Sequence, residues 1–192
     1  MRYVKFYLNL ILISLLCFGS IQSTLAQPAT TIRIVDNNFN APTGPLIYST
    51  IQDAVDAAEA GDIVYIQPSP SKYGSASTYK TLHFKGIGFN LDKDQPHISN
   101  VTNIILTNNV DNTQNASGST IDGLDVDLIR LAKSGGTPSY TMSDVIVNNC
   151  TINFLQVLSG ANVTAENFEL SNSRVSGDIL FYSPLINSVI RN

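Results

Sequence analysis

The feature that most constrains this chain is a repeated unit of a short apolar strand, one or two Asn or Gly residues, a second strand and a loop. Aligning the turns places Gly123, Asn149, Asn167 and Asn192 at equivalent positions, 26, 18 and 25 residues apart. A period of roughly 20–25 residues made only of strands is typical of a β-solenoid, whose coils bury their apolar sides only by stacking. The segments that predict strands are 30–36, 62–68, 80–89, 103–109, 119–131, 144–154, 162–170 and 187–192.

The frequent Asn residues support this interpretation, because Asn tolerates the left-handed conformation that a sharp turn between strands needs. Asn side chains at equivalent positions of successive coils can also form hydrogen-bonded amide ladders. A β-sandwich with Asn-rich turns is the alternative. Apart from the ambiguous "IDGLDV" at 121–126, the chain has no two-residue Asn-Gly or Asp-Gly turn between matched alternating strands.

Residues 1–26 have the three parts of a secretory signal peptide. Arg2 and Lys5 are basic, 8–18 is an apolar run, and Thr24-Leu25-Ala26 places small residues at the cleavage site. A membrane anchor needs about 20 continuous apolar residues, which this run lacks. We therefore expect a secreted or cell-surface protein with no membrane insertion after cleavage, in which 27–192 forms the N-terminal part of a β-helix domain.

A short amphipathic helix is predicted at about 50–60, directly before a strand. Thr50 is a plausible N-cap with Asp53 three residues later, and Gly61 is the expected left-handed residue that ends the helix. A helix this short is marginal alone, so we expect it to cover the open end of the stack. Its apolar stripe, with helical spacing, is Ile51, Ala54, Val55 and Ala58.

The stretch "STIQDAVDAAEAGDIVYIQPSPSKYG", followed by "KTLHFKGIGFNL" and "GSTIDGLDV", resembles the N-terminal part of right-handed parallel β-helix proteins of the pectin-lyase-like superfamily, especially secreted examples from Bacteroidetes. The resemblance covers 47 to about 126. It implies a right-handed parallel β-helix whose first coil is capped by a helix, but no particular activity, because the superfamily includes lyases, hydrolases, esterases and non-catalytic proteins. The matching residues are Ile51, Gln52, Ala54, Ala58, Gly61, Asp62, Tyr73, Gly74, Leu82, Gly86 and Gly88.

The last segment, "NSVIRN" at 187–192, repeats the first half of "SDVIVNNCTI" and stops where another apolar strand is due. A solenoid ending there would expose the apolar face and the strand edges of its last coil. We therefore expect these residues to belong to a longer or truncated protein. A dimer that pairs through this end is the alternative.

Acidic residues are the first candidates for chemistry. The resemblance suggests that calcium-binding carboxylates and an Arg base, as in pectate lyases, would be sought at Asp122, Asp125, Asp127 and Arg130. Asp125 and Asp127 are two apart and share one face of a strand, so a hard-cation site is conceivable, but a solvent-facing polar side of the strand is the favoured interpretation. The pair Asp92 and Asp94 lies in a loop-like stretch.

The other reactive side chains are isolated. His83 is expected on the outer side of a strand, and His97 has no partner for a zinc site. Cys150 lies in an apolar strand and is expected to be a buried, inert thiol. In "SKYGSASTYK" at 71–80, Tyr and Lys residues interleave, which suggests either a glycan contact or an ordinary exposed loop.

No metal-binding, cofactor-binding or catalytic constellation emerges from these residues. The net charge is −4 with no basic run, which argues against a nucleic-acid partner. We therefore expect an exported, non-catalytic β-helix module, structural or contacting polysaccharide or cell-surface glycan. The alternatives are a fragment of a polysaccharide lyase or glycoside hydrolase whose catalytic coils are missing, and a remnant without a function of its own.

Overall fold

The described part of the protein is a parallel β-helix with a short helix over one end of the stack. The computed structural model describes residues 29–88, 97–132, 140–157 and 163–191. The predicted signal peptide, the pair Asp92 and Asp94, and Asn192 lie outside these residues. Within the described residues every pairing between named strands is parallel, which confirms the predicted fold class and excludes the β-sandwich.

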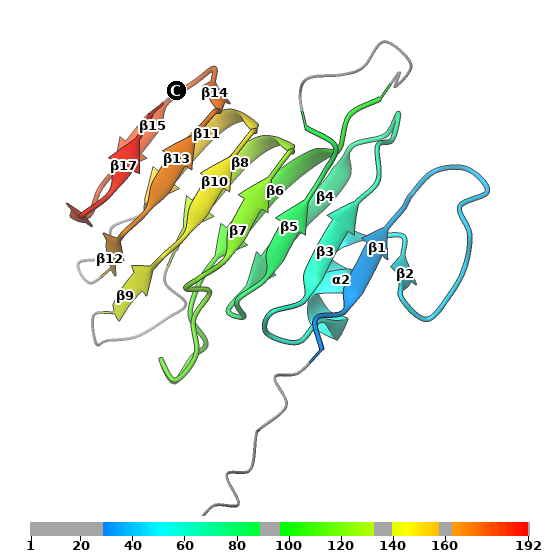
Figure 1. Cartoon of the computed structure of the whole chain (residues 1–192), viewed down its shortest axis with the longest axis horizontal. Helices are drawn as coiled ribbons and strands as arrows, with labels where there is room; N and C mark the ends of the chain where they lie inside the picture. The colour runs from blue at the N-terminus through cyan, green and yellow to red at the C-terminus, as the bar shows by residue number, and fades with distance from the viewer. Residues whose placement is uncertain (1–28, 89–96, 133–139, 158–162, 192) are drawn as a thin grey trace, which may run out of the picture.

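Among the described residues the largest sheet has eight strands, drawn side by side from blue to red in Figure 1. Sequential coils contribute neighbouring strands, so the order along this sheet from β3 to β17 follows the order along the chain. Its strands are β1 (Ile32–Val35), β2 (Ile47–Tyr48), β3 (Ile63–Ile66), β5 (His83–Lys85), β7 (Thr120–Asp122), β10 (Ile146–Asn148), β13 (Glu169–Ser171) and β17 (Val189–Ile190).

Two further sheets complete the coils. The six-stranded sheet contains β4 (Tyr73–Thr78), β6 (Asn100–Leu106), β8 (Asp125–Leu131), β11 (Thr151–Val157), β14 (Arg174–Val175) and β15 (Ile179–Phe181), with both of the last two pairing with β11. The three-stranded sheet contains β9 (Tyr140–Ser143), β12 (Val163–Glu166) and β16 (Leu185–Ile186).

The core is made of inward-facing side chains that stack from coil to coil. In the first sheet one column runs through Val64, Phe84, Ile121, Val147 and Leu170, which are paired in register and buried. The six-stranded sheet contributes parallel columns of the same kind. Each coil thus removes apolar surface from water only against its neighbours, as expected for a solenoid.

Two columns of left-handed residues turn the chain between strands. Gly123, Asn149 and Asn172 follow β7, β10 and β13 at matching positions, with φ of 70°, 53° and 46°. The predicted equivalence of Gly123 and Asn149 is therefore confirmed. The prediction for Asn167 is wrong, because this residue belongs to the second column, which precedes the strands of the large sheet.

The second column contains Asp144, Asn167 and Asn187, with φ of 59°, 52° and 50°. Side chains hydrogen-bond from coil to coil, as the predicted amide ladders require, but the partners are mixed. Asn167 Nδ2 donates to Asp144 Oδ1 at 2.9 Å. In the large sheet Asn148 Nδ2 donates to Asp122 Oδ1 at 3.0 Å.

The helix α2 (Ile51–Ala57) closes the first end of the stack, and Figure 1 shows it behind β1 and β3. Thr50 is its N-cap, as predicted, and Thr50 Oγ1 accepts a hydrogen bond from Asp53 N at 3.2 Å. The predicted end is wrong: Ala58 is the C-cap in an extended conformation, and Gly61, at φ 91°, turns the chain four residues after the helix instead. The apolar stripe Ile51, Ala54, Val55 and Ala58 is buried, as predicted.

Gln52 completes this closure by a side-chain interaction with the edge of β4. Its Oε1 accepts from Ser77 N at 2.9 Å, and its Nε2 donates to Ser77 O at 3.3 Å. The amide therefore takes the place of a neighbouring strand for one residue of β4. A strand at the edge of a sheet has backbone N–H and C=O groups that no neighbouring strand pairs with. The Gln52 amide satisfies one N–H and one C=O group of this edge.

The stretch 71–80 is mainly a strand, so its interpretation as an exposed loop is wrong. β4 pairs with β6 over its whole length, and Tyr73 is buried with its hydroxyl donating to Val35 O at 3.2 Å. Ser and Gly occupy most of the outward positions of β4, which is why its composition resembles that of a loop.

Candidate functional site

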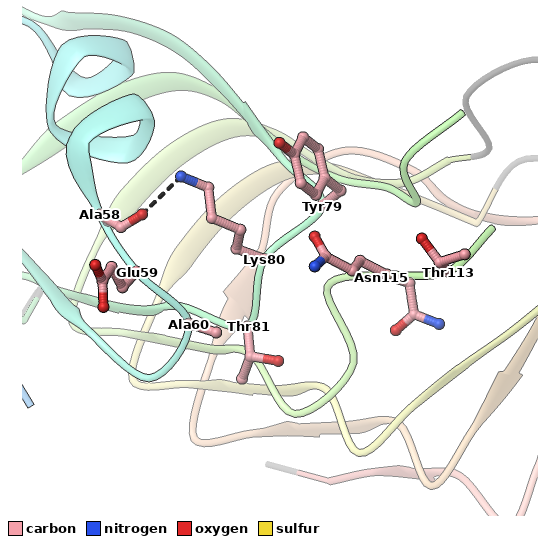
Figure 2. Close-up of a pocket in the computed structure, with 9 residues that line it drawn as sticks. Ala58, Glu59, Ala60, Tyr79, Lys80, Thr81, Thr113 and Asn115 are labelled. Carbon is pink, nitrogen blue, oxygen red and sulfur yellow. Dashed lines mark hydrogen bonds between the residues drawn. The ribbon is translucent and has the colours of Figure 1, made fainter. Parts of the chain in front are cut away.

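A pocket lies beside the C-terminal end of α2, where three separate segments meet. It has a volume of about 520 Å³ and is lined by 58–60, 79–81 and 113–115. In the view of Figure 2 the 58–60 segment borders one side, Tyr79, Thr113 and Asn115 border the other, and Lys80 lies between them. We call this site the Tyr79 pocket.

Coil stacking explains why these three segments meet. The 58–60 segment leads from α2 toward β3, and 79–81 leads from β4 to β5 in the next coil. Gly61 N donates to Thr81 O at 2.8 Å, which fixes these two turns against each other. Residues 113–115 belong to the excursion between β6 and β7, and Thr81 Oγ1 donates to Ser117 O at 2.6 Å to hold its base.

Lys80 is a structural residue of the pocket wall. Its Nζ donates to the carbonyl oxygens of Val55, Asp56 and Ala58 at 2.9, 3.1 and 2.6 Å. These carbonyls carry the negative end of the helix dipole, which an ammonium group stabilises. An ammonium group has three donors, so all of the donors of Lys80 are used.

Asn115 is also held by the protein. Its Oδ1 accepts from Ser117 N at 2.9 Å, and its Nδ2 donates to Thr141 O at 3.3 Å. Thr113 Oγ1 accepts from Asn109 Nδ2 at 2.8 Å, and Gln114 N donates to Asn109 Oδ1 at 3.1 Å. These hydrogen bonds fix the backbone of residues 113–115, the third segment that lines the pocket.

Three polar groups of the pocket make no hydrogen bond or ion pair with the part of the chain that the structure describes. They are the carboxylate of Glu59, the hydroxyl of Tyr79 and the side-chain amide of Gln114. Tyr79 is 42% exposed, so part of its ring is open to solvent. The pocket therefore offers a ligand an aromatic surface, an acceptor carboxylate and an amide that can both donate and accept.

The acidic candidates from the sequence do not form one site. Asp122 ends β7 in the large sheet, whereas Asp125, Asp127 and Arg130 lie on β8 in the six-stranded sheet. Lys72 Nζ contacts both carboxylate oxygens of Asp127 at 2.7 Å. Arg130 donates from Nε and Nη2 to Gln156 Oε1 at 3.2 and 3.0 Å, so it is oriented along its own sheet.

Asp125 lies on β8 where its carboxyl group is partly buried and close to the charges of Lys72 and Asp127. Burial raises the pKa of Asp125, Lys72 opposes the rise, and the neighbouring charge of Asp127 adds to it. Asp125 and Asp127 are both partly exposed on the same face of β8, as the sequence predicted. Among the described residues, no group of three or more His, Cys, Asp or Glu side chains could hold a metal ion.

The predicted outer position of His83 and the predicted burial of Cys150 are confirmed, but Cys150 lies in the turn between β10 and β11 rather than in a strand. His83 is half-exposed on the outer side of β5, where its Nδ1 is 3.0 Å from Thr120 Oγ1, and His97 is exposed. Cys150 is buried, and this burial raises the pKa of its thiol to about 12. A thiol with so high a pKa is protonated at neutral pH and therefore a poor nucleophile.

Tyr79 and Lys80 belong to the stretch 71–80, whose interleaved Tyr and Lys residues suggested a glycan contact, whereas nothing in the sequence pointed to Glu59 and Gln114. Glu59 follows a helix whose length was overestimated, and Gln114 lies in the polar stretch "TNNVDNTQNAS" at 107–117, which carries no periodic signal. Only the accumulation of amides in that stretch indicated a structured loop rather than a simple connection.

A comparison of the chain with protein-family models, curated proteins and solved structures found no match. Among the described residues, no helix has the length and apolar character needed to cross a membrane. For the described part of the chain, the structure establishes a solenoid of parallel strands and, beside its capping helix, a pocket with three polar groups that make no hydrogen bond to described residues.

Proposed function

We propose that this protein is an exported, non-catalytic β-helix module that contacts carbohydrate in the Tyr79 pocket. The observation that carries the proposal is the combination of an exposed Tyr79 ring with the side chains of Glu59 and Gln114, which have no hydrogen-bond partner among the described residues. Sugar rings present C–H faces that pack on aromatic rings and hydroxyl groups that pair with carboxylate and amide groups. Export rests on the predicted signal peptide at 1–26.

We also propose kinship with the pectin-lyase-like β-helix proteins. This proposal is supported by two residues that match the superfamily pattern and help to close the first coil. Gln52 hydrogen-bonds to the edge of β4, and Asp62 connects the turn before β3 to the start of β1. These roles are architectural. They agree with a non-catalytic module, in which the shared motif preserves the fold rather than a reaction.

Replacing Tyr79 tests the carbohydrate contact directly. Binding of cellohexaose, xylohexaose, mannohexaose and hexagalacturonate would be measured by isothermal titration calorimetry. We expect Tyr79→Ala to weaken binding of the preferred glycan about tenfold, because the loss of a partly buried aromatic surface costs about 1–2 kcal/mol. The matched control is Tyr182→Ala, since Tyr182 is 55% exposed and lies outside the pocket.

Equal binding by the wild type and Tyr79→Ala would contradict the proposal, as would an equal loss in Tyr182→Ala. The non-catalytic part has its own measurement. Incubation with polygalacturonate and calcium is expected to yield no unsaturated product, and incubation with the neutral glycans no new reducing ends. Sustained turnover of any of them would overturn that part.

A further inference from the structure

The charged residues that line the Tyr79 pocket affect whether it favours neutral or acidic glycans. Its charged lining residues are Lys80 and Glu59. Lys80 would be the natural partner for an acidic sugar, but its ammonium already donates to three carbonyl oxygens at the end of α2. A uronate that recruited Lys80 would leave these helix carbonyls without their donor, which costs free energy.

Unlike the ammonium group of Lys80, the carboxylate of Glu59 is available to a ligand. Its backbone N–H donates to Asp62 Oδ2 at 3.0 Å, which fixes the main chain, while its carboxylate is exposed and free among the described residues. An ionised carboxylate only accepts hydrogen bonds, so it suits hydroxyl donors. A second carboxylate at about 4 Å would be repelled by about 1 kcal/mol in water, and by more where solvent is partly excluded.

From this arrangement we infer that the Tyr79 pocket selects neutral, multiply hydroxylated glycans and rejects chains of uronic acid. The inference rests on the proposed carbohydrate contact and deepens it. Glu59 accepts hydroxyl hydrogens, Gln114 supplies both a donor and an acceptor, and Tyr79 packs on the C–H face of the ring. The remaining cation, Lys80, keeps its charge, but its three N–H donors hold the helix end, so it has none left for the carboxylate of a ligand.

The test compares neutral and acidic hexasaccharides on the wild type, Glu59→Gln and Tyr79→Ala, at low and at high salt. We expect the wild type to bind its preferred neutral hexasaccharide at least tenfold more tightly than hexagalacturonate, with little dependence on salt. Glu59→Gln is expected to weaken neutral binding about tenfold, because hydrogen bonds to a charged group are lost. The same variant is expected to tighten hexagalacturonate binding. Asp178→Asn, at an exposed carboxylate outside the pocket, is the matched control.

The experiment distinguishes failure of the selectivity, failure of the role of Glu59 and failure of the carbohydrate contact itself. If hexagalacturonate bound as tightly as the neutral glycans, and Tyr79→Ala weakened that binding, the selectivity would be overturned while the carbohydrate contact stood. If Glu59→Gln left both affinities unchanged, the role of Glu59 would be overturned. If Tyr79→Ala changed the binding of no glycan, or if the wild type bound none, both the inference and the proposed function would fall.

Discussion

At the residue scale, Asp62 joins the beginning of the fold to its first turn. It is 4% exposed and accepts hydrogen bonds from Thr31 N at 2.9 Å, Glu59 N at 3.0 Å and Arg33 Nε at 3.0 Å. One carboxylate thus accepts hydrogen bonds from the residue before β1, from the segment after α2 and from a largely buried guanidinium. Removing it would leave several donors without partners away from water.

The pKa of Asp62 makes this role measurable. Burial alone would raise the pKa, but the hydrogen bonds from Glu59, Thr31 and Arg33 outweigh it and lower the pKa below the ordinary 3.8. A lowered folded pKa contributes stability that is present above the ordinary value and is lost as the pH falls through the folded value. The contribution of Asp62 should therefore be complete at pH 7 and decline in acid.

We accordingly predict that Asp62→Asn lowers the free energy of unfolding by about 2–3 kcal/mol at pH 7. Urea unfolding of both proteins at pH 7 and at about pH 2–3 should show the difference shrinking in acid, because the wild-type carboxyl becomes protonated. Asp178→Asn, at an exposed position, should stay within about 0.5 kcal/mol of the wild type. A difference that stays constant with pH would contradict this account of Asp62.

At the element scale, the corner that follows β5 is tightly packed. A Cβ added at Gly86 would lie 2.5 Å from Leu124 Cδ2 and 2.7 Å from Ser99 Cβ, and closer still to the carbonyl oxygen of Gly123. Gly74, in the interior of β4, has no atom within 4 Å of an added Cβ. Both glycines belong to the motif of the resemblance, yet only one is required by close packing.

The two glycines therefore form a matched pair of substitutions. Gly86→Ala should lower the free energy of unfolding by about 1–3 kcal/mol, because the added methyl group cannot be accommodated without backbone movement. Gly74→Ala should be neutral or stabilising by up to about 1 kcal/mol, since alanine restricts the unfolded chain. Urea unfolding measures both, and similar effects of the two substitutions would contradict the packing described for the corner.

Much of this element-scale structure could be predicted from the sequence. The strands at 119–131 and 144–154 were identified because apolar residues alternate around a Gly or Asn turn. β4 was missed because its outward positions carry Ser and Gly, which need no bulk on a solvent-facing side. Asn167 was assigned to the wrong column because the coils differ in length, so that spacing alone does not fix the register.

The role of the serines at the corners between strands could not be recognised from the sequence. Ser119 Oγ accepts from Leu82 N at 3.1 Å, and Ser173 Oγ accepts from Cys150 N at 3.1 Å, each from the preceding coil. Ser188 Oγ accepts from Phe168 N in the same way. These hydroxyls satisfy backbone donors where the strands stop pairing. Serine is common in ordinary loops, so only the three-dimensional register shows this role.

At the scale of the whole molecule, stacking creates the candidate site. Residues 58–60, 79–81 and 113–115 belong to successive coils and meet only because each coil lies on the one before. The sequence predicted the stack and indicated the stretch 71–80, which contains Tyr79, as one possible place for a glycan contact. It could not predict the pocket, because the length of α2 and the path of the excursion at 107–119 decide which side chains face it.

The most direct test of this account is a map of glycan binding by backbone amide NMR shifts of the full chain. Titration with the neutral hexasaccharide preferred in calorimetry should shift amides in all three segments, 58–60, 79–81 and 113–115, with one shared affinity. Tyr79→Ala should weaken that affinity for all three together. Shifts confined to a single segment, or located on the outer side of β5, β7 and β10 instead, would contradict the claim that coil stacking builds a glycan site at Tyr79.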